Sequence, residues 1–253
     1  MNKNQLSNTN SLNITPLSAT KLTGDNKRNY IRQLFNNIST RYDFINNLIF
    51  LGHIKLWHQW ALSDLELKPG TNILDIGCGT GHSTQYLHYR YPGLNIEGMD
   101  LSPGMLSEAR RLHPHLNFFE GDVCAIPRPD ATYDLVTTIF TFRNFPNHQT
   151  PINEMLRVLR PGGKLLILDL FYPQEPLWWQ KVYTFWIKKI IPAIVIPFIE
   201  DPTPYSYLGE SIINGLNVSD FKLLLEDHGA SVSQINSYTG GAAVKLIAVR
   251  KNL

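Results

Sequence analysis

Apolar residues near the start of the chain recur at helical spacing. Between about residues 28 and 62, side chains such as Ile31, Leu34 and Ile38 return every three or four positions and form one apolar face. A helix with such a face must bury it against another element. We therefore expect a helical cap over residues 25–68.

The period of the pattern changes after residue 70. Short apolar runs, separated by helical stretches, have the length and composition of buried strands. Strands that alternate with helices favour a parallel sheet with helices on both faces. The sequence thus predicts an α/β fold, with a doubly wound, mostly parallel sheet of seven strands in a single domain over residues 25–253. The strand-like runs cover residues 72–76, 94–99, 117–119, 134–139, 164–170, 232–238 and 242–250.

Two segments differ from this alternation. Residues 1–24 are rich in Asn, Ser and Thr and poor in large apolar side chains, which predicts a disordered tail. Residues 175–215 are expected to form a lid or acceptor-side insertion, because residues 177–199 are aromatic and apolar with interspersed lysines. Such a stretch covers a lipophilic ligand, rests on a bilayer or simply packs on the sheet. Pro192 and Pro197 are expected to break any long helix there.

Composition narrows the class of protein. The 253 residues are 43% apolar and 17% charged, which suits a globular core. Lys and Arg number 23 against 21 acidic residues, so there is no basic field for nucleic acid. Two cysteines, and histidines without metal-ligand spacing, predict no metal site. Since no signal-peptide core or run of about 18 apolar residues occurs, we expect a cytoplasmic protein. Peripheral contact at the inner membrane face and a homodimer are left open.

A glycine-rich loop joins the first predicted strand to a helix. It reads Asp75-Ile76-Gly77-Cys78-Gly79-Thr80-Gly81. Glycines at such a turn let a ligand approach the backbone closely. A dinucleotide fingerprint would need a third glycine where Ser83 and Thr84 stand, and the Gly-Lys-Ser/Thr of a phosphate-binding loop is absent. The loop therefore indicates a nucleotide-like ligand of another kind.

Three acids follow successive strands around this loop. Asp75 precedes the glycines and suits a cation better than a phosphate. Asp100 is placed to accept hydrogen bonds from both hydroxyls of a ribose, and Asp122 can accept one from an exocyclic amine of adenine. S-adenosylmethionine carries a ribose, an adenine and an ammonium group but no phosphate, so it fits these acids. A structural turn would explain a lone glycine loop, but not two further acids in register with it.

Further motifs extend beyond the loop. With them the chain resembles class I S-adenosylmethionine-dependent methyltransferases, which share a Rossmann-like sheet. More closely, it resembles the ubiquinone/menaquinone-biosynthesis C-methyltransferase family, from about residue 28 to 250. The motifs are Arg41-Tyr42-Asp43-Phe44-Ile45-Asn46, Phe142-Arg143-Asn144-Phe145, the run from Met155 to Gly163, and Tyr205-Ser206-Tyr207-Leu208-Gly209-Glu210-Ser211-Ile212.

The resemblance implies roles for particular residues. Arg143 and Asn144 would organise water for deprotonating the acceptor ring, and Tyr42 would line the substrate side. Thr80 would contact S-adenosylmethionine together with Asp100 and Asp122. The cofactor site expected on this basis comprises Asp75, Gly77, Gly79, Thr80, Gly81, Asp100, Leu101, Met105, Asp122, Val123 and Ile139.

The implied activity is C-methylation of a prenylated quinol in menaquinone or ubiquinone biosynthesis. A ring carbon attacks a methyl group only when an adjacent hydroxyl is ionised, so the reduced quinol is the expected acceptor. Two alternatives stay open: methylation of another hydroxylated aromatic or secondary metabolite, and a non-catalytic cofactor-binding scaffold in a quinone-synthesis complex.

Departures from the family pattern motivate the first alternative. Ile54 and Lys55 stand where the family carries a histidine and an arginine, and Leu246 stands where it carries another histidine. Ile139 occupies a position that is serine in some relatives. We expect these positions on the acceptor side or the inner wall of the site. His53 is a candidate proton acceptor by residue type, although a packing role is favoured.

Overall fold

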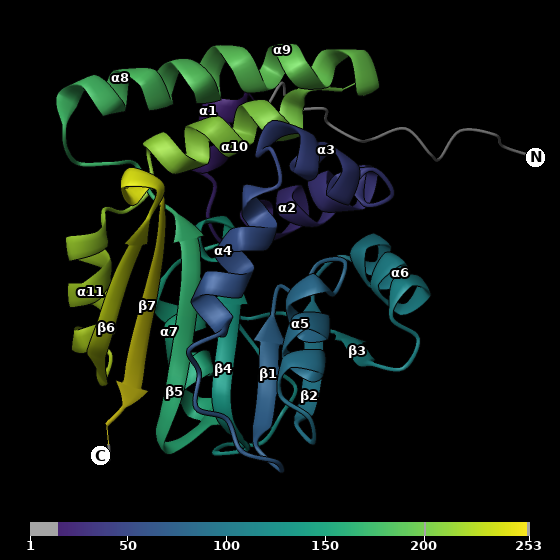
Figure 1. Ribbon diagram of the computed structural model, residues 1–253, viewed down its shortest axis with the longest axis vertical. Coiled ribbons are helices and arrows are strands. Elements are labelled where there is room, and N and C mark those ends of the chain that lie inside the picture. The colour runs from purple at the N-terminus through teal and green to yellow at the C-terminus, as the bar shows by residue number, and fades with distance from the viewer. Residues whose placement is uncertain (1–14, 200, 252–253) are drawn as a thin grey trace, which may run out of the picture.

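The computed structural model describes residues 15–199 and 201–251, and these residues contain a single seven-stranded sheet (Figure 1). The strand order is β3-β2-β1-β4-β5-β7-β6, and only β7 runs antiparallel to its neighbours. The predicted α/β fold is therefore confirmed. The strands are β1 (Asn72–Ile76), β2 (Asn95–Asp100), β3 (Asn117–Glu120), β4 (Tyr133–Ile139), β5 (Leu159–Leu170), β6 (Ala230–Tyr238) and β7 (Ala243–Arg250).

Helices cover both faces of the sheet because successive strand residues point to opposite sides. In β1, Ile73 packs on one side with residues of α4 and α5, whereas Leu74 packs on the other with residues of α7 and α11. Both side chains are fully buried. The helices named here and below are α4 (His53–Leu62), α5 (His82–Arg90), α6 (Pro103–Leu112), α7 (Gln149–Val158) and α11 (Val218–Asp227).

The predicted helical cap consists of α2 (Gly24–Ile38), α3 (Tyr42–Ile49) and α4. Helices α2 and α3 lie over the carboxyl edge of the parallel strands, and α4 runs from there down one face of the sheet (Figure 1). The tail prediction is wrong for residues 15–24, because Pro16–Thr20 form a short helix, α1. Thr15 caps α1 by accepting the N–H of Ser18 at 3.2 Å, and Ala19 is fully buried. Residues 1–14 lie outside the described residues.

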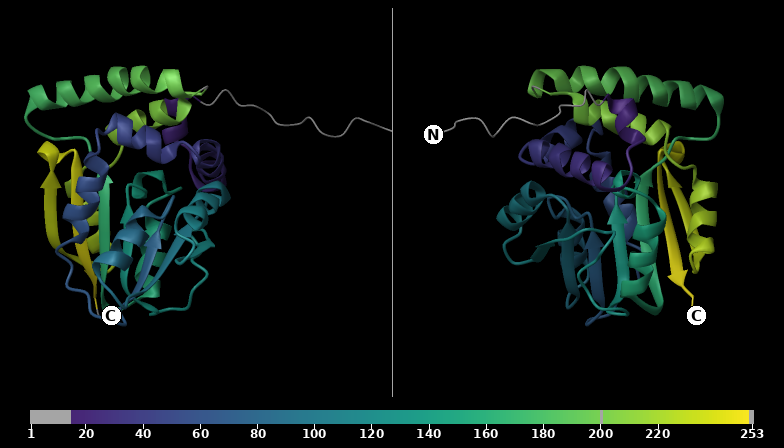
Figure 2. Two further views of the ribbon diagram at one scale, coloured as in Figure 1. Left: turned by 45° about the vertical axis from the view of Figure 1, so that its right-hand side comes forward. Right: turned by 180° about the vertical axis from the view of Figure 1, so that it is seen from behind.

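A long helical layer covers the cap on the side away from the sheet (Figures 1 and 2). It runs from α8 (Leu177–Phe185) through a π-helical turn (Trp186–Ile190) into α9 (Ile191–Val195), and α10 (Thr203–Ile213) lies beneath it. The expected break at Pro192 does not occur, whereas α9 ends just before Pro197 and is followed by a 3₁₀ turn (Ile196–Phe198). We attribute the continuity at Pro192 to the π-helical turn before it. The N–H of Ile191 donates to the carbonyl of Trp186, and Pro192 then stands in the first turn of α9, where a missing N–H is tolerated.

Candidate active site

The glycine loop leaves β1 at its carboxyl end and enters α5. Gly77, Gly79 and Gly81 take positive φ angles of 67°, 55° and 87°, where a side chain would be strained. A Cβ on Gly77 would lie 2.2 Å from Cγ2 of Thr141, so the loop passes directly against the segment after β4. The N–H of Gly77 donates to the carbonyl of Met99 on β2 at 2.7 Å. The loop is thus held between the end of β2 and the segment after β4, the two strands that flank β1 in the sheet.

Asp100 ends β2 and faces this loop. Its Oδ2 accepts the N–H of Gly79 at 2.9 Å, and its Oδ1 accepts the N–H of Ser102 at 2.8 Å. Burial raises the pKa of Asp100 to about 6 against the opposing effect of these backbone hydrogen bonds. A carboxylate offers about four lone pairs, so Asp100 keeps acceptor capacity for ligand hydroxyls.

Asp100 lies on the wall of a small cavity of about 80 Å³ beside the loop. Most residues expected to bind the cofactor meet there, from the loop, the end of β2, the start of α6 and the segment after β3. Those on this wall are Gly77, Gly79, Asp100, Leu101, Met105, Asp122 and Val123.

Helix α2 contributes another part of the same wall. Arg28 lines the cavity, and its Nε pairs with Oδ2 of Asp122 at 2.6 Å. One turn on, Arg32 pairs with Glu120 at 2.6 Å. Asp122 therefore already holds a cationic partner from the cap, which the sequence did not indicate.

Asp75 and Gly81 line neither this cavity nor the larger one. Asp75 is 1% exposed, and its carboxylate accepts hydrogen bonds from the hydroxyls of Ser83, Thr84 and Thr137 at 2.5, 2.7 and 2.8 Å. The expectation that Asp75 faces a ligand cation is therefore wrong, because three protein hydroxyls occupy it. Two of them follow the loop at the first turn of α5, which is a signal readable in the sequence.

Gly81 precedes α5 and packs closely against the β3 edge. A Cβ there would lie 2.7 Å from Cζ of Phe118 and 2.9 Å from Cδ2 of His113, so the close packing requires glycine. The expected contact of Gly81 with the cofactor stays a prediction.

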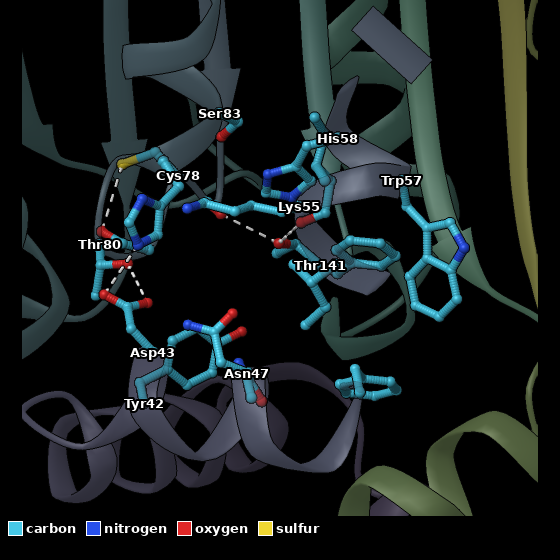
Figure 3. Close-up of a pocket in the computed structure, with 18 of the residues that line it drawn as sticks. Tyr42, Asp43, Asn47, Lys55, Trp57, His58, Cys78, Thr80, Ser83 and Thr141 are labelled. Carbon is cyan, nitrogen blue, oxygen red and sulfur yellow. Dashed lines mark hydrogen bonds and ion pairs between the residues drawn. The ribbon is translucent and has the colours of Figure 1, made fainter. Parts of the chain in front are cut away.

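A larger cavity, of about 720 Å³, lies between the cap helices and the sheet edge (Figure 3). Aromatic and aliphatic side chains from α2, α3, α4 and α10 form much of its wall, including Tyr205, Tyr207 and Leu208 of the last predicted motif. It shares Tyr42, Gly77, Gly79 and Asn144 with the small cavity, so the two cavities adjoin. The predicted residues on its wall are Tyr42, Ile54, Lys55, Gly77, Gly79, Thr80, Ile139, Arg143 and Asn144.

Asp43 places a carboxylate on this wall that the sequence did not assign to the site. Its Oδ1 accepts the hydroxyl of Thr80 at 2.8 Å, and its Oδ2 lies 3.0 Å from Nε2 of His82. Burial would raise the pKa of Asp43, but the hydrogen bonds from His82 and Thr80 and the charge of His82 outweigh it and lower the pKa. Figure 3 shows Asp43 on α3 directed at Thr80 of the loop.

Arg143 is held against the end of β5. Its Nη1 donates to Oδ1 of Asp169 at 2.6 Å and to the carbonyl of Phe140 at 2.7 Å. The Nε of Arg143 is buried without a hydrogen-bond partner, as is Oδ1 of the neighbouring Asn144. Buried polar atoms of this kind are usually satisfied. On a cavity wall, they are candidates to bind a ligand or a water.

Two histidines of α4 differ in their relation to the cavity. His53 contacts the carbonyl of Phe50 at 2.9 Å and does not line the cavity, which agrees with a packing role. His58, missed in the sequence, lines it and stacks on Phe140 with ring centroids 5.6 Å apart. Burial lowers the pKa of His58 to about 4, so its imidazole is neutral at pH 7. Its position four residues after Ile54 could have placed both on one helix face.

Leu246 does not belong to the acceptor side or the inner wall, contrary to expectation. It is fully buried within β7, among the side chains on the α7 and α11 side of the sheet. Its replacement of a family histidine therefore changes the core of the sheet and neither cavity.

Comparison with known proteins agrees with this architecture. A demethylmenaquinone methyltransferase of Paenarthrobacter aurescens (strain TC1) is 30% identical over 211 residues, covering 83% of this chain and 82% of the relative. That of Staphylococcus haemolyticus (strain JCSC1435) is 32% identical over 221 residues, covering 86% and 92%. A SAM-dependent methyltransferase structure from Aquifex aeolicus has a TM-score of 0.55 at 20% identity, over 76% of this chain and 88% of that one.

A second solved structure contains the cofactor. Phosphoethanolamine N-methyltransferase 2 of Haemonchus contortus, in complex with S-adenosyl-L-methionine, superposes with a TM-score of 0.60 at 15% identity. It covers 86% of this chain and 60% of that one. At this identity the likeness concerns the fold alone.

The fold is thus that of the class I S-adenosylmethionine-dependent methyltransferases. The model of the ubiE/COQ5 methyltransferase family matches residues 23–250, and the chain belongs to that family. In residues 15–199 and 201–251, no His, Cys, Asp and Glu side chains group as a metal site. None of the helices in those ranges has the length and hydropathy of a membrane span.

Proposed function

We propose that this methyltransferase methylates a ring carbon of a prenylated quinol. The observation that carries the proposal is the meeting of the two cavities at Tyr42 and Asn144, with Arg143 on the wall of the larger one. The small cavity carries Asp100 and Asp122 and adjoins the large one, so a nucleotide-like cofactor would extend across both, and the aromatic side chains of the large cavity suit a lipophilic acceptor. The names of the relatives, demethylmenaquinone methyltransferases, support a menaquinone precursor as that acceptor.

The residues around the small cavity fit S-adenosylmethionine. Asp100 retains acceptor capacity for ribose hydroxyls, and Leu101 and Val123 offer apolar contact for a base. Asp43, kept ionised by His82 and Thr80, faces the adjoining cavity with a negative charge. When bound, S-adenosylmethionine supplies a methyl group on a positively charged sulfur, which such a carboxylate attracts.

Arg143 and Asn144 act on the acceptor in this proposal. A quinol ring carbon becomes nucleophilic when an adjacent hydroxyl loses its proton. Arg143 cannot be the base because a guanidinium keeps its proton up to a pKa of about 12. Its positive charge and free Nε stabilise the phenolate oxygen, and the unpartnered Oδ1 of Asn144 accepts a hydrogen bond from a water or a hydroxyl.

Quinones from a strain lacking the gene test this function. We expect a quinone lighter by one methyl group to accumulate, and the normal quinone to return when the wild-type gene is restored. Methylation of another hydroxylated aromatic, the alternative that Ile54 and Lys55 motivate, predicts an unchanged quinone pool. Assays of the purified protein on hydroxylated aromatics without a prenyl tail then identify that acceptor.

We also propose that the outer face of α8 and α9 contacts an anionic bilayer. Its exposed apolar side chains are Leu177, Trp178, Val182 and Phe185, and Ile196 and Phe198 follow in the turn after α9. Residues 177–199 contain no acid, and the exposed Lys181 and Lys189 give this stretch a positive charge that complements anionic lipid, whereas Lys188 is paired with Glu210 of α10. A face of this kind would bring a prenyl tail close to the cap that covers the large cavity.

Vesicle flotation tests the bilayer contact. Trp178→Gln with Phe185→Gln should reduce flotation with vesicles containing phosphatidylglycerol, whereas Tyr89→Gln, an exposed aromatic on α5, should not. If the double variant instead alters the mass of the protein in solution and not its flotation, the face is a homodimer interface.

A further inference from the structure

Lys27 is a buried lysine that the chemistry described so far does not use. It lies on α2 and is 3% exposed. Its Nζ donates to Oη of Tyr207 at 2.7 Å and to the carbonyl of Ala19 at 3.3 Å. Among the residues described in the structure, no carboxylate pairs with Lys27. Lysine is rarely buried without such a partner, so this one requires an explanation.

Lys27 and Tyr207 lie between the large cavity and a third cavity. Tyr207, on α10, lines the large cavity, whereas Lys27 lines a separate cavity of about 880 Å³. Exposed residues such as Lys21 and Asn147 also line this third cavity, which therefore reaches the surface. The pair joins the acceptor cavity to solvent through a single hydrogen bond. Helices α1, α2 and α10, which hold these residues, lie together beneath α8 and α9 (Figure 2).

The surroundings of Lys27 favour its neutral form. Burial, and then the positive charge of Arg143, lower the pKa of Lys27 to about 8. Arg143 is itself paired with Asp169, and His148, ahead of α7, has its pKa lowered by burial and by Lys27. Tyr30 faces Tyr207 edge to face, and burial raises the pKa of both phenols. A neutral amine can accept a proton, and a tyrosine with a raised pKa can pass one on without becoming anionic.

We propose that Tyr207 and Lys27 form the relay that removes the proton from the acceptor's hydroxyl. This rests on the proposed function, since the relay needs an acceptor with an ionisable hydroxyl in the large cavity. The acceptor's O–H bond breaks, and its proton moves to Oη of Tyr207. The proton of Tyr207 moves at the same time to the lone pair of Lys27 Nζ, which becomes an ammonium. Water in the third cavity then takes the proton.

The proton balance of ring methylation agrees with such a relay. The hydroxyl proton leaves first, and the proton lost from the methylated ring carbon then restores the hydroxyl, so one proton is released overall and must leave a buried site. His58, a neutral imidazole on the wall of the large cavity, is a weaker proton acceptor because its pKa lies near 4. Lys27, with a pKa near 8, is better matched to a phenol near neutral pH. Tyr207 touches the acceptor cavity directly, whereas Lys27 acts through it.

Single-turnover methyl transfer as a function of pH tests the relay. In the wild type we expect the rate to rise about tenfold per pH unit up to about pH 8 and then to level. Tyr207→Phe and Lys27→Met should each lower the rate about a hundredfold and remove the inflection. Lys27→Arg keeps the charge and the donor but cannot lose a proton, so it should be equally slow. Lys222→Met, a surface lysine on α11, is the matched control.

Two further measurements separate proton transfer from folding. Cofactor affinity and melting temperature should change little in Tyr207→Phe, because phenylalanine keeps the ring and its packing. This variant therefore still tests the relay if Lys27→Met folds poorly. NMR titration of lysine labelled at Cε should show Lys27 with a pKa near 8. An ordinary lysine pKa of about 10.4, or wild-type rate and inflection in Lys27→Arg, overturns the relay.

The proposed function and the relay fail in different ways. If no quinol is methylated, the proposed function fails. The pH profiles are then recorded with the hydroxylated aromatic that the protein does methylate. The NMR titration still measures the pKa of Lys27, because it needs no acceptor. If quinol is methylated but all variants keep the wild-type inflection, only the relay fails.

Discussion

Asp75 and Asp43 both accept hydrogen bonds from hydroxyls, but only Asp43 lies on a cavity wall. Asp75→Ala should lower the free energy of unfolding by about 3 kcal/mol or more, because three buried hydroxyls lose their acceptor. Asp43→Asn, in contrast, should leave stability nearly unchanged and weaken cofactor binding. Denaturant unfolding and calorimetry on both variants check this. A stable Asp75→Ala protein with weak cofactor binding would restore the ligand role of Asp75.

Asp100 gives cofactor binding a dependence on pH. Since the carboxyl has a pKa raised to about 6, ionisation opposes folding, and the free energy of unfolding falls as pH rises from about 4 to 6. The ionised carboxyl accepts ribose hydroxyls, so affinity for S-adenosylmethionine should rise between about pH 5 and 7 and then level. Asp100→Asn should bind about ten- to a hundredfold more weakly at pH 8 and show no such rise. Calorimetry across this range decides; an equal pH dependence in the variant rules the assignment out.

Arg143 combines a structural and a chemical role, and comparing variants of Arg143 and of its partner Asp169 separates the two roles. Arg143→Ala should lower stability, since breaking a buried ion pair costs about 3–5 kcal/mol, and should slow methyl transfer about a hundredfold or more. Asp169→Asn should also lower stability but leave the rate within about tenfold, because the guanidinium remains on the cavity wall. Cofactor affinity should stay within a few-fold in both. Equal methyl-transfer rates in the two variants would mean that Arg143 only stabilises the end of β5 and has no role in the reaction.

At the scale of elements, α2 is the part of the cap that responds to the cofactor. It lines the small cavity with Arg28, Ile31 and Phe35, and its ion pair with Asp122 is partly solvent-exposed and therefore weak. Cofactor addition should slow hydrogen exchange of amides in α2 and leave those in α11, on the far side of the sheet, unchanged. Mass spectrometry of exchanged peptides measures both helices. Identical protection of α2 with and without cofactor contradicts its role as a cover.

Strands that are short apolar runs could be predicted, and the observed β1 has the predicted bounds, residues 72–76. β5 instead begins at Leu159, five residues before the predicted start at residue 164, because its first part is polar and rich in glycine. Two helical features depend on contacts that sequence patterns do not carry. Helix α1 exists because Thr15 caps it and Ala19 is buried against the body of the protein. The helix continues through Pro192 because a π-helical turn precedes it.

Much of the site could be predicted in the same way. Asp100 and Asp122 end or follow adjacent strands, and parallel strands bring their carboxyl ends to one edge. Asp43 and Lys27 could not be singled out, because their roles depend on Thr80 and Tyr207, which are far away in the chain. The periodicity of apolar residues indicates which face of a helix or strand a residue occupies. The partners of Asp43 and Lys27 depend instead on how the cap helices pack against the rest of the protein.

At the scale of the whole molecule, the sheet and the cap supply different parts of one reaction. The sheet edge holds the glycine loop and Asp100 beside the small cavity, and the cap closes a large, mostly apolar cavity over it. Asn144, just after β4, lies where the two adjoin, and Arg143 precedes it on the wall of the large cavity. An acceptor bound there would meet the methyl donor with its hydroxyl near a fixed positive charge.

Methyl transfer to a prenylated demethylquinone in its two redox states tests this account most directly. The purified protein is given S-adenosylmethionine with an isotopically labelled methyl group, either with the quinone or with the quinol kept reduced without oxygen. We expect label on the ring of the quinol only, because only the reduced ring has a hydroxyl to ionise. Equal labelling of the oxidised quinone, under conditions that prevent its reduction, would contradict the account.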